Sequence, residues 1–187
     1  DSGTIEFING EYVVNYGGIK IDKSDLNVEG EAHFHNSDTE LDRSKANFND
    51  KLTLIDSAML LKNSSSLNVG GVADFTDSAL VVQNGSKVMF GNNFTMKNRE
   101  NGAEKSIIIL DNGSEINIKG NFENHGIIYY GASADSAPKI TVEGKTTLKD
   151  TTEIGIYATS GDISNLNQAV FLESKGAIEN KATDENI

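Results

Sequence analysis

The sequence predicts an all-β fold, a right-handed parallel β-helix of about seven to eight coils, each with about 20 residues and three short strands. A corner motif, Asp/Asn-x-Ser-x-Φ-Asn-Φ with Φ apolar, recurs with variations. Its copies open at residues 1, 22, 42, 63, 84, 112 and 136, in steps of 21, 20, 21, 21, 28 and 24 residues. Short alternating runs follow each copy, and no segment has helical periodicity with caps. A left-handed β-helix would need strict six-residue repeats, which the sequence lacks.

The first strand of each coil is predicted from the end of the corner motif. Alternation places its two Φ positions on one face, so stacked coils form two inner columns. The first column is Ile5, Leu26, Ala46, Leu67, Val88, Ile116 and Ile140, and the second is Phe7, Val28, Phe48, Val69, Phe90, Ile118 and Val142. The residue between them points outward, and four coils place Asn there: Asn27, Asn47, Asn68 and Asn117. Stacked amides predict an outward Asn ladder.

Two corners per coil are predicted from their residue types. The Asp or Asn that opens the motif is expected to bond the backbone two residues on. The corner after the first strand contains glycine, as at Gly30, Gly70, Gly120 and Gly144, and is expected to be left-handed. A second strand follows, and then a third with dense apolar runs, at residues 58–61, 79–82, 107–110 and 127–130.

Residues 1–187 are interpreted as a single β-helix segment, a fragment of a longer protein. Residues 150–187 fit the repeat less well, and an eighth coil is expected to open near residues 174–178. Two coils are longer than the others, which predicts loops at residues 97–105 and 131–138, because extra residues leave the stack of a solenoid.

Composition excludes several classes of function. A net charge of −12 argues against binding to nucleic acid or to anionic membrane surfaces. There is no apolar run long enough for a membrane-spanning helix, so direct insertion of this segment is not expected. Cysteine is absent, as is common in long secreted β-solenoids.

The sequence contains no constellation of catalytic residues. His33 and His35 lie on the same side of one predicted strand, which could begin a metal site, but no motif supplies a third ligand. The carboxylates are scattered over outward positions. There is no phosphate-binding loop, dinucleotide fingerprint or catalytic triad. We therefore expect no enzyme activity, no cofactor and no metal.

The chain resembles the passenger domains of autotransporters, the type V secreted proteins of Gram-negative bacteria. The resemblance rests on the coil length, the absence of cysteine, the acidic balance, the Asn/Gly/Ser/Thr-rich corners, and phrases such as GIIYYG at residues 126–131 and GIYA at residues 155–158. The sequence is similar to large fusobacterial adhesins of this class, and the two-partner-secreted haemagglutinins share the β-helix fold. The resemblance implies a passenger at the bacterial surface or secreted, ahead of an outer-membrane barrel.

The hypothesis is a surface adhesin segment that mediates or projects adhesion to host cells or other bacteria. Its partner would be a surface protein or glycan, and self-association is a variant. The expected contact is the loop that includes Asn98, Arg99, Glu100, Asn101, Glu104 and Lys105. Two alternatives stay open: a fragment of a polysaccharide-acting lyase or depolymerase, and a purely structural stalk or self-associating rod.

Overall fold

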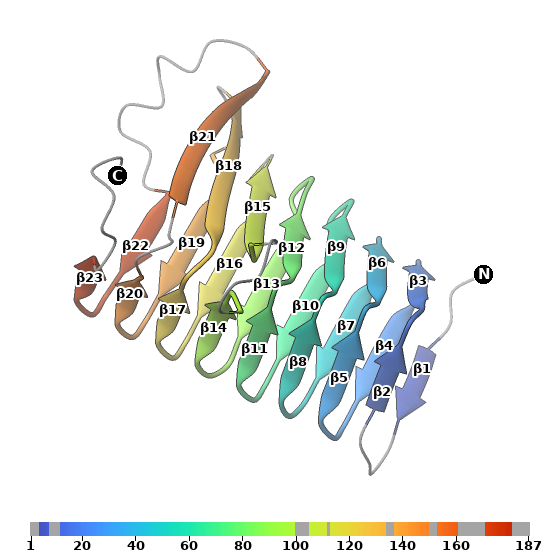
Figure 1. Ribbon diagram of the computed structural model, residues 1–187. Coiled ribbons are helices and arrows are strands. Elements are labelled where there is room, and N and C mark those ends of the chain that lie inside the picture. Colours follow the sequence, from blue (N-terminus) through green and yellow to red (C-terminus); the bar gives the residue numbers. More distant parts are fainter. Residues whose placement is uncertain are drawn as a thin grey trace.

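The computed structural model describes residues 4–7, 12–99, 105–111, 113–133, 137–149, 153–160 and 171–180. Every regular element within these residues is a β-strand, and the strands form three parallel sheets of 8, 8 and 7 strands (Figure 1). We call the sheets A, B and C in the order in which the chain enters them. After one strand in each sheet the chain steps to the next coil, and it winds in a right-handed sense. The predicted right-handed parallel β-helix is therefore confirmed.

The strands are short and evenly repeated. Sheet A contains β1 (Thr4–Phe7), β4 (Asp25–Val28), β7 (Lys45–Phe48), β10 (Ser66–Val69), β13 (Lys87–Phe90), β16 (Glu115–Ile118), β19 (Lys139–Val142) and β22 (Leu172–Ser174). Sheet B contains β2 (Tyr12–Asn15), β5 (Ala32–His35), β8 (Leu52–Ile55), β11 (Ala73–Thr76), β14 (Phe94–Lys97), β17 (Phe122–Asn124), β20 (Thr146–Leu148) and β23 (Ile178–Asn180). Sheet C contains β3 (Gly18–Asp22), β6 (Asp38–Asp42), β9 (Ala58–Lys62), β12 (Ala79–Val82), β15 (Ile107–Asp111), β18 (Ile127–Ser133) and β21 (Glu153–Ser160).

The register of sheet A is the predicted one, because each strand pairs with the same motif positions of the next coil. Leu26 pairs with Ala46, and Leu67 pairs with Ala46 and Val88. Both inner columns are buried from the second coil onward, and they join one core with the inward residues of sheets B and C. The stacking continues through aromatic rings: Phe94 lies 5.4 Å from Phe122, centroid to centroid, with the planes 12° apart. Parallel stacking of like coils thus supplies the hydrophobic core.

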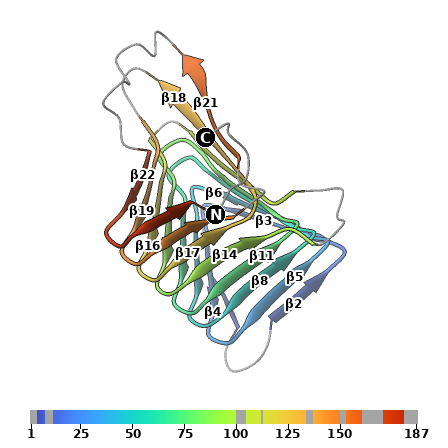
Figure 2. The same ribbon diagram turned by 60° about the vertical axis from the view of Figure 1, so that its left-hand side comes forward.

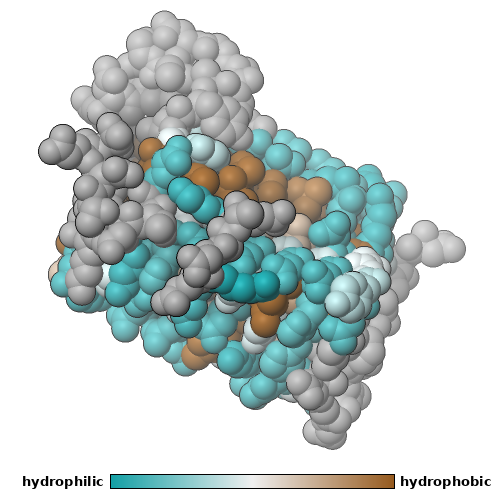
Figure 3. Space-filling view, in the orientation of Figure 1, coloured by the Kyte–Doolittle hydropathy of each residue, from teal (hydrophilic) through white to brown (hydrophobic). Residues whose placement is uncertain are grey.

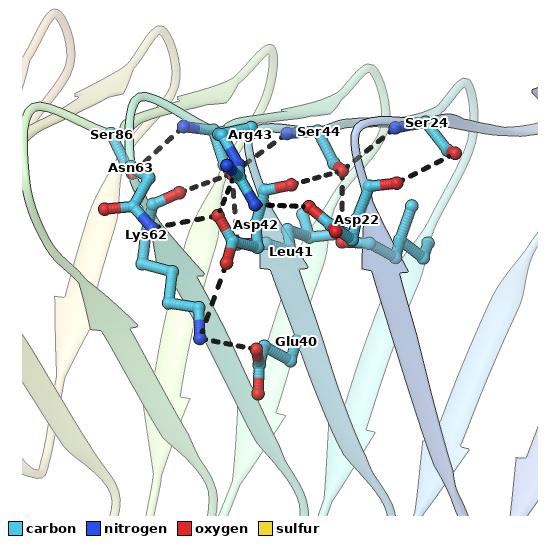
Figure 4. Close-up of polar contacts among 12 residues, drawn as sticks. Asp22, Ser24, Glu40, Leu41, Asp42, Arg43, Ser44, Lys62, Asn63 and Ser86 are labelled. Atoms are coloured by element: carbon cyan, nitrogen blue, oxygen red, sulfur yellow. Dashed lines mark hydrogen bonds and ion pairs between the residues drawn. The ribbon is translucent and has the colours of Figure 1, made fainter. Parts of the chain in front are cut away.

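The corner that opens each coil is built differently from the expectation. The Ser44 hydroxyl donates back to the Asp42 carbonyl at 2.7 Å and accepts the Ser24 N–H at 3.2 Å. The Ser44 N–H in turn donates to the Ser65 hydroxyl at 3.1 Å, and Ser65 continues to Ser86 (Figure 4). The prediction that the Asp side chain bonds the backbone two residues on is wrong for these corners. The N–H at that position donates instead to the serine hydroxyl of the next coil.

A second serine ladder stabilises the corner between sheets B and C. The N–H groups of Ser37, Ser57 and Ser78 donate to the hydroxyls of Ser57, Ser78 and Ser106, each at 3.2 Å. These serines are buried, so the ladder satisfies polar groups that would otherwise lack partners. Sequence analysis missed this ladder, although an Asn/Asp-Ser pair recurs at residues 36–37, 56–57 and 77–78.

The glycine corner between sheets A and B also differs from the expectation. Among the described glycines, only Gly85 and Gly113, in the opening corner, have positive φ. At the predicted left-handed corners the requirement is space. A Cβ on Gly70 would lie 2.5 Å from the carbonyl oxygen of Asn49, and one on Gly144 would lie 2.6 Å from that of Gly120. Glycine is needed there because the backbones of adjacent coils approach closely.

The C-terminal coils correct two boundaries. The eighth coil opens at Leu172, which pairs with Ile140, so the predicted start at residues 174–178 is the end of β22, the corner at 175–177 and the first residue of β23. Residues 131–133 of the predicted bulge continue β18, which pairs with β21, and both strands extend beyond the other strands of sheet C (Figure 2). Residues 100–104 and 134–136 of the two predicted loops lie outside the described residues.

Candidate functional site: the outward face of sheet C

The outward side of sheet C is apolar over its middle strands. Inward residues such as Met59, Leu80 and Ile108 are fully buried, while their neighbours along the strand point outward and are partly exposed. We define the apolar face as Ala58, Leu60, Ala79, Val81, Ile107, Ile109, Ile127 and Tyr129. It forms the hydrophobic area in the upper part of Figure 3. A contiguous apolar patch on a protein surface is typical of an interaction site.

The other two sheets present polar residues at the equivalent positions. The middle outward residues of sheet B are His33, Thr53, Asp74, Thr95, Glu123 and Thr147. Those of sheet A are mainly asparagines. The contrast was detectable in the sequence, because a strand that is apolar at successive positions has two apolar faces. The runs at residues 58–61, 79–82, 107–110 and 127–130 carried this signal, but sequence analysis used them only to place the third strand.

The two halves of this sheet differ in relief. A groove of about 650 Å³ crosses β3, β6, β9 and β12, lined by Gly18, Asp38, Glu40, Ala58, Leu60 and Val81 among others. A smaller hollow of about 270 Å³ adjoins it at the corner with sheet B, beside Ala79 and Lys105. Gly18, Asp38, Ala58 and Ala79 are small or short at positions where β15 and β18 carry Ile107 and Ile127. The groove therefore lies in the N-terminal half of the sheet, and we call the larger side chains of β15 and β18 at the equivalent positions the ridge.

A network of charges borders the groove at the opening corner (Figure 4). Lys62 Nζ lies 2.6 Å from Glu40 Oε1 and 3.7 Å from Asp42 Oδ2, and Asn63 Nδ2 donates to Asp42 Oδ1 at 2.9 Å. Arg43 continues the network to Asp22 at 2.9 Å. Hydrogen bonds from Lys62 and Lys20 lower the pKa of Glu40, and the Asn63 amide is the main cause that lowers the pKa of Asp42. Both acids are thus held ionised, which suits a fixed charged rim and not a proton donor.

Asp111 lies at the same end of sheet C, at the margin of the ridge. Its side chain is nearly buried, and its Oδ2 is 3.5 Å from Gln83 Nε2. Burial raises the pKa of the Asp111 carboxyl. Lys62, Gln83 and Asp111 follow one another at equivalent positions of β9, the end of β12, and β15. Within the described residues, this carboxylate has no cationic partner, whereas Glu40 and Asp42 on β6 pair with Lys62.

The loop predicted as the contact site is only partly described, and its described residues serve as anchors. Asn98 Nδ2 donates to the His125 carbonyl, and Asn98 Oδ1 accepts the Ser106 N–H, both at 2.7 Å. Arg99 pairs with Asp77 at 3.1 Å and also with Asp56, so it clamps two earlier coils. Lys105 is exposed beside the smaller hollow. Glu100, Asn101 and Glu104 lie outside the described residues.

The predicted Asn ladder exists over three coils. Asn47 Nδ2 donates to Asn27 Oδ1 at 2.7 Å, and Asn68 Nδ2 donates to Asn47 Oδ1 at 2.9 Å. Met89 occupies the next position, so Asn117 is separated from the other three. The amides satisfy one another along sheet A, on a different side of the helix from the apolar face.

The two predicted histidines lie on β5, and His33 contacts a nearby carboxylate. His33 Nε2 lies 3.3 Å from Glu31. No group of three or more His, Cys, Asp or Glu side chains that could hold a metal ion occurs among the described residues. The same part of the chain contains no helix long and apolar enough to cross a membrane.

Comparison with known proteins finds no matching family model, no matching curated protein and no matching solved structure.

Proposed function

We propose that this chain is a segment of a bacterial surface adhesin of the autotransporter type, which binds another protein through the apolar face of sheet C. The observation that carries the proposal is the contrast between the outward faces: one sheet presents aliphatic residues in successive coils where the others present polar ones. A rigid rod with one apolar side suits contact between cell surfaces, because a solenoid offers an extended binding surface.

The composition of the face favours a protein as the partner. Its middle row is aliphatic, with Leu60, Val81 and Ile109 in successive strands and Tyr129 at the end. Aliphatic surface supplies affinity by excluding water, and the charged rim formed by Glu40 and Lys62 supplies orientation. The partner would be a protein on a host cell or on a neighbouring bacterium, which places this chain at the bacterial surface.

The test is binding of the labelled 187-residue chain to epithelial cells and to bacteria, measured by flow cytometry. Leu60→Lys and Ile109→Lys place charges in the apolar face, and each should reduce binding by about tenfold or more, because a buried unpaired charge is costly. The matched controls are Thr53→Lys and Thr95→Lys, at partly exposed outward positions of sheet B. Circular dichroism confirms that each variant is folded.

Three other outcomes are informative. Equal binding by all four variants would exclude the apolar face. Loss of binding only when residues 100–104 are replaced by a Gly-Ser linker would assign adhesion to the loop. If the unaltered chain binds neither cell type, the segment acts as a stalk, and the proposal fails.

A further inference from the structure

The outward face of sheet C carries both halves of a complementary shape, a groove and a ridge. The groove spans β3 to β12, and the ridge consists of Ile107, Ile109, Ile127 and Tyr129 on β15 and β18. The strand order of sheet C places β12 at the centre, with three strands on either side. A surface that bears a shape and its complement at equal distances from its centre can bind a copy of itself through a two-fold axis.

We propose that the partner of this face is a second copy of the chain, packed face to face with its helical axis antiparallel to the first. The two-fold axis runs parallel to the strands, beside Val81 on β12. In this arrangement β9 faces β15 of the partner and β6 faces β18 of the partner. This inference rests on the proposed function, since it names the partner of the same face.

The side chains that meet in this arrangement complement one another in size. Rotation about an axis parallel to the strands keeps each residue at the same height along its strand. Ala58 therefore faces the partner's Ile107, and the groove around Leu60 receives the partner's Ile109. Val81 packs against its own copy on the axis.

The charges at the margin complement one another as well. Lys62 and Asp111 lie at the same height on β9 and β15, so each faces the other residue of the opposite copy. Asp111 has no cationic partner within the described chain, and its carboxylate is nearly buried. Glu40 faces the partner's Tyr129, whose hydroxyl donates to Glu153 of its own chain, and Glu40 keeps its ion pairs with Lys62 and Lys20. Each pair occurs twice, once on either side of the axis.

The parallel arrangement of two copies lacks these features. A two-fold axis along the rod would place the ridge residues against themselves and Glu40 against the partner's Glu40. Like charges directly opposed across an interface are unfavourable. Shape and charge thus agree on the antiparallel arrangement, in which rods from two facing cells could interlock.

The size of the face predicts weak binding. The apolar face covers four strands at about 4.8 Å spacing, which is well below the extent of a standard stable interface. The net charge of −12 on each copy adds repulsion. Association should therefore exchange rapidly and strengthen with added salt, because salt screens this repulsion. On a cell surface, many weak contacts would act together.

The first experiment is cross-linking, which the absence of cysteine makes specific. Val81→Cys should give a covalent dimer with a short bismaleimide, because the two copies of residue 81 meet at the axis. Thr53→Cys, on the outward face of sheet B, should remain monomeric under the same conditions. Equal cross-linking of both variants would show random collision and would overturn the proposal.

The second experiment tests the pairing of Lys62 with Asp111 by sedimentation velocity over a wide range of protein concentration. Lys62→Glu alone and Asp111→Lys alone should each weaken dimerisation by about tenfold. A mixture of the two variants should associate again, since the heterodimer restores an opposite-charge pair on both sides of the axis. Mixing cannot repair a purely intramolecular defect, so this readout is independent of the ion pairs that Lys62 makes within its own chain.

The outcomes separate this inference from the proposed function. Cross-linking at residue 81 with recovery in the mixture supports the antiparallel dimer. A chain that stays monomeric at all concentrations, yet binds cells in a manner that Leu60→Lys abolishes, would overturn the inference and retain the adhesin function. A dimer that is unaffected by Leu60→Lys would place self-association on another surface and likewise overturn it.

Discussion

Sheets A and C are built from the same coils, yet their outward faces are opposite in character. Sheet A presents a ladder of asparagines, in which Asn47 bonds both neighbouring coils. Sheet C presents Leu60, Val81 and Ile109 at the corresponding middle positions. Their inward residues are mostly apolar and buried in both sheets, with Thr39 as a polar exception in sheet C. The difference shows that inward positions maintain the stack, whereas outward positions are free to be specialised. An apolar outward face therefore calls for a functional reason.

The largest expected effect is a loss of stability when an inward side chain is removed, compared with its outward neighbour. Phe94→Ala removes a ring that is stacked with Phe90 at 4.1 Å and with Phe122 at 5.4 Å. It should lower the free energy of unfolding by about 3–5 kcal/mol, because it leaves a cavity in the core. Thr95→Ala, the next residue and outward, should change it by less than about 0.5 kcal/mol. Urea unfolding measures the free energy of unfolding of both variants. Similar losses of stability in the two would contradict the conclusion that inward residues maintain the stack and outward residues do not.

The next effect concerns the corners that join the sheets. Ser57→Ala removes a hydroxyl that accepts the Ser37 N–H and can donate to the Ile55 carbonyl. The loss should be about 1–3 kcal/mol, since a buried N–H is left without a partner. Ser66→Ala, at an outward position of sheet A, is the matched control. If both substitutions had the same small effect, the serine ladder would not stabilise the corner.

A smaller effect, and a gain in stability, is expected from a substitution at the margin of the apolar face. Burial raises the pKa of the Asp111 carboxyl, so the folded state holds its proton more firmly than the unfolded state does. Ionisation above that pKa therefore costs stability. Asp111→Asn should raise the unfolding temperature at neutral pH in dilute, monomeric protein. This gain should vanish as the pH falls through the raised pKa towards about 3.9. A gain that is constant with pH would exclude the ionised carboxylate as its cause.

The smallest expected effects on stability come from substitutions on the outward faces of sheets A and C, and comparing them tests whether the two faces differ in function. Asn47→Ala breaks two amide contacts at a partly exposed position and should cost about 0.5 kcal/mol without changing adhesion or self-association. Val81→Thr should change stability as little, but it should weaken self-association because it places a hydroxyl at the centre of the apolar face. Thermal unfolding and sedimentation velocity on both variants compare the faces directly. Weakened association in Asn47→Ala would show that the ladder contributes to the interface.

Much of the fold could be predicted because the repeat places chemically equivalent residues in every coil. The column from Leu26 to Ile140 and its register follow from the corner motif alone. Two details could not be derived. Whether a glycine such as Gly70 is needed for its φ or for close backbone approach depends on the neighbouring coil. The hydroxyl ladder likewise joins residues of different coils, and local turn chemistry does not reveal it.

The sequence by itself determined the solenoid, its inner columns, the Asn ladder and the acidic charge, because each depends on periodicity or composition. Only the tertiary structure decided where the groove lies and which residues the loop at 97–105 is anchored to. It revealed that Asn98 and Arg99 anchor their loop, and that a groove crosses the face whose apolar character the third-strand runs had already signalled. The physical reason is that a groove or a continuous outward face is formed by coils about 20 residues apart, and it exists only once the coils are stacked.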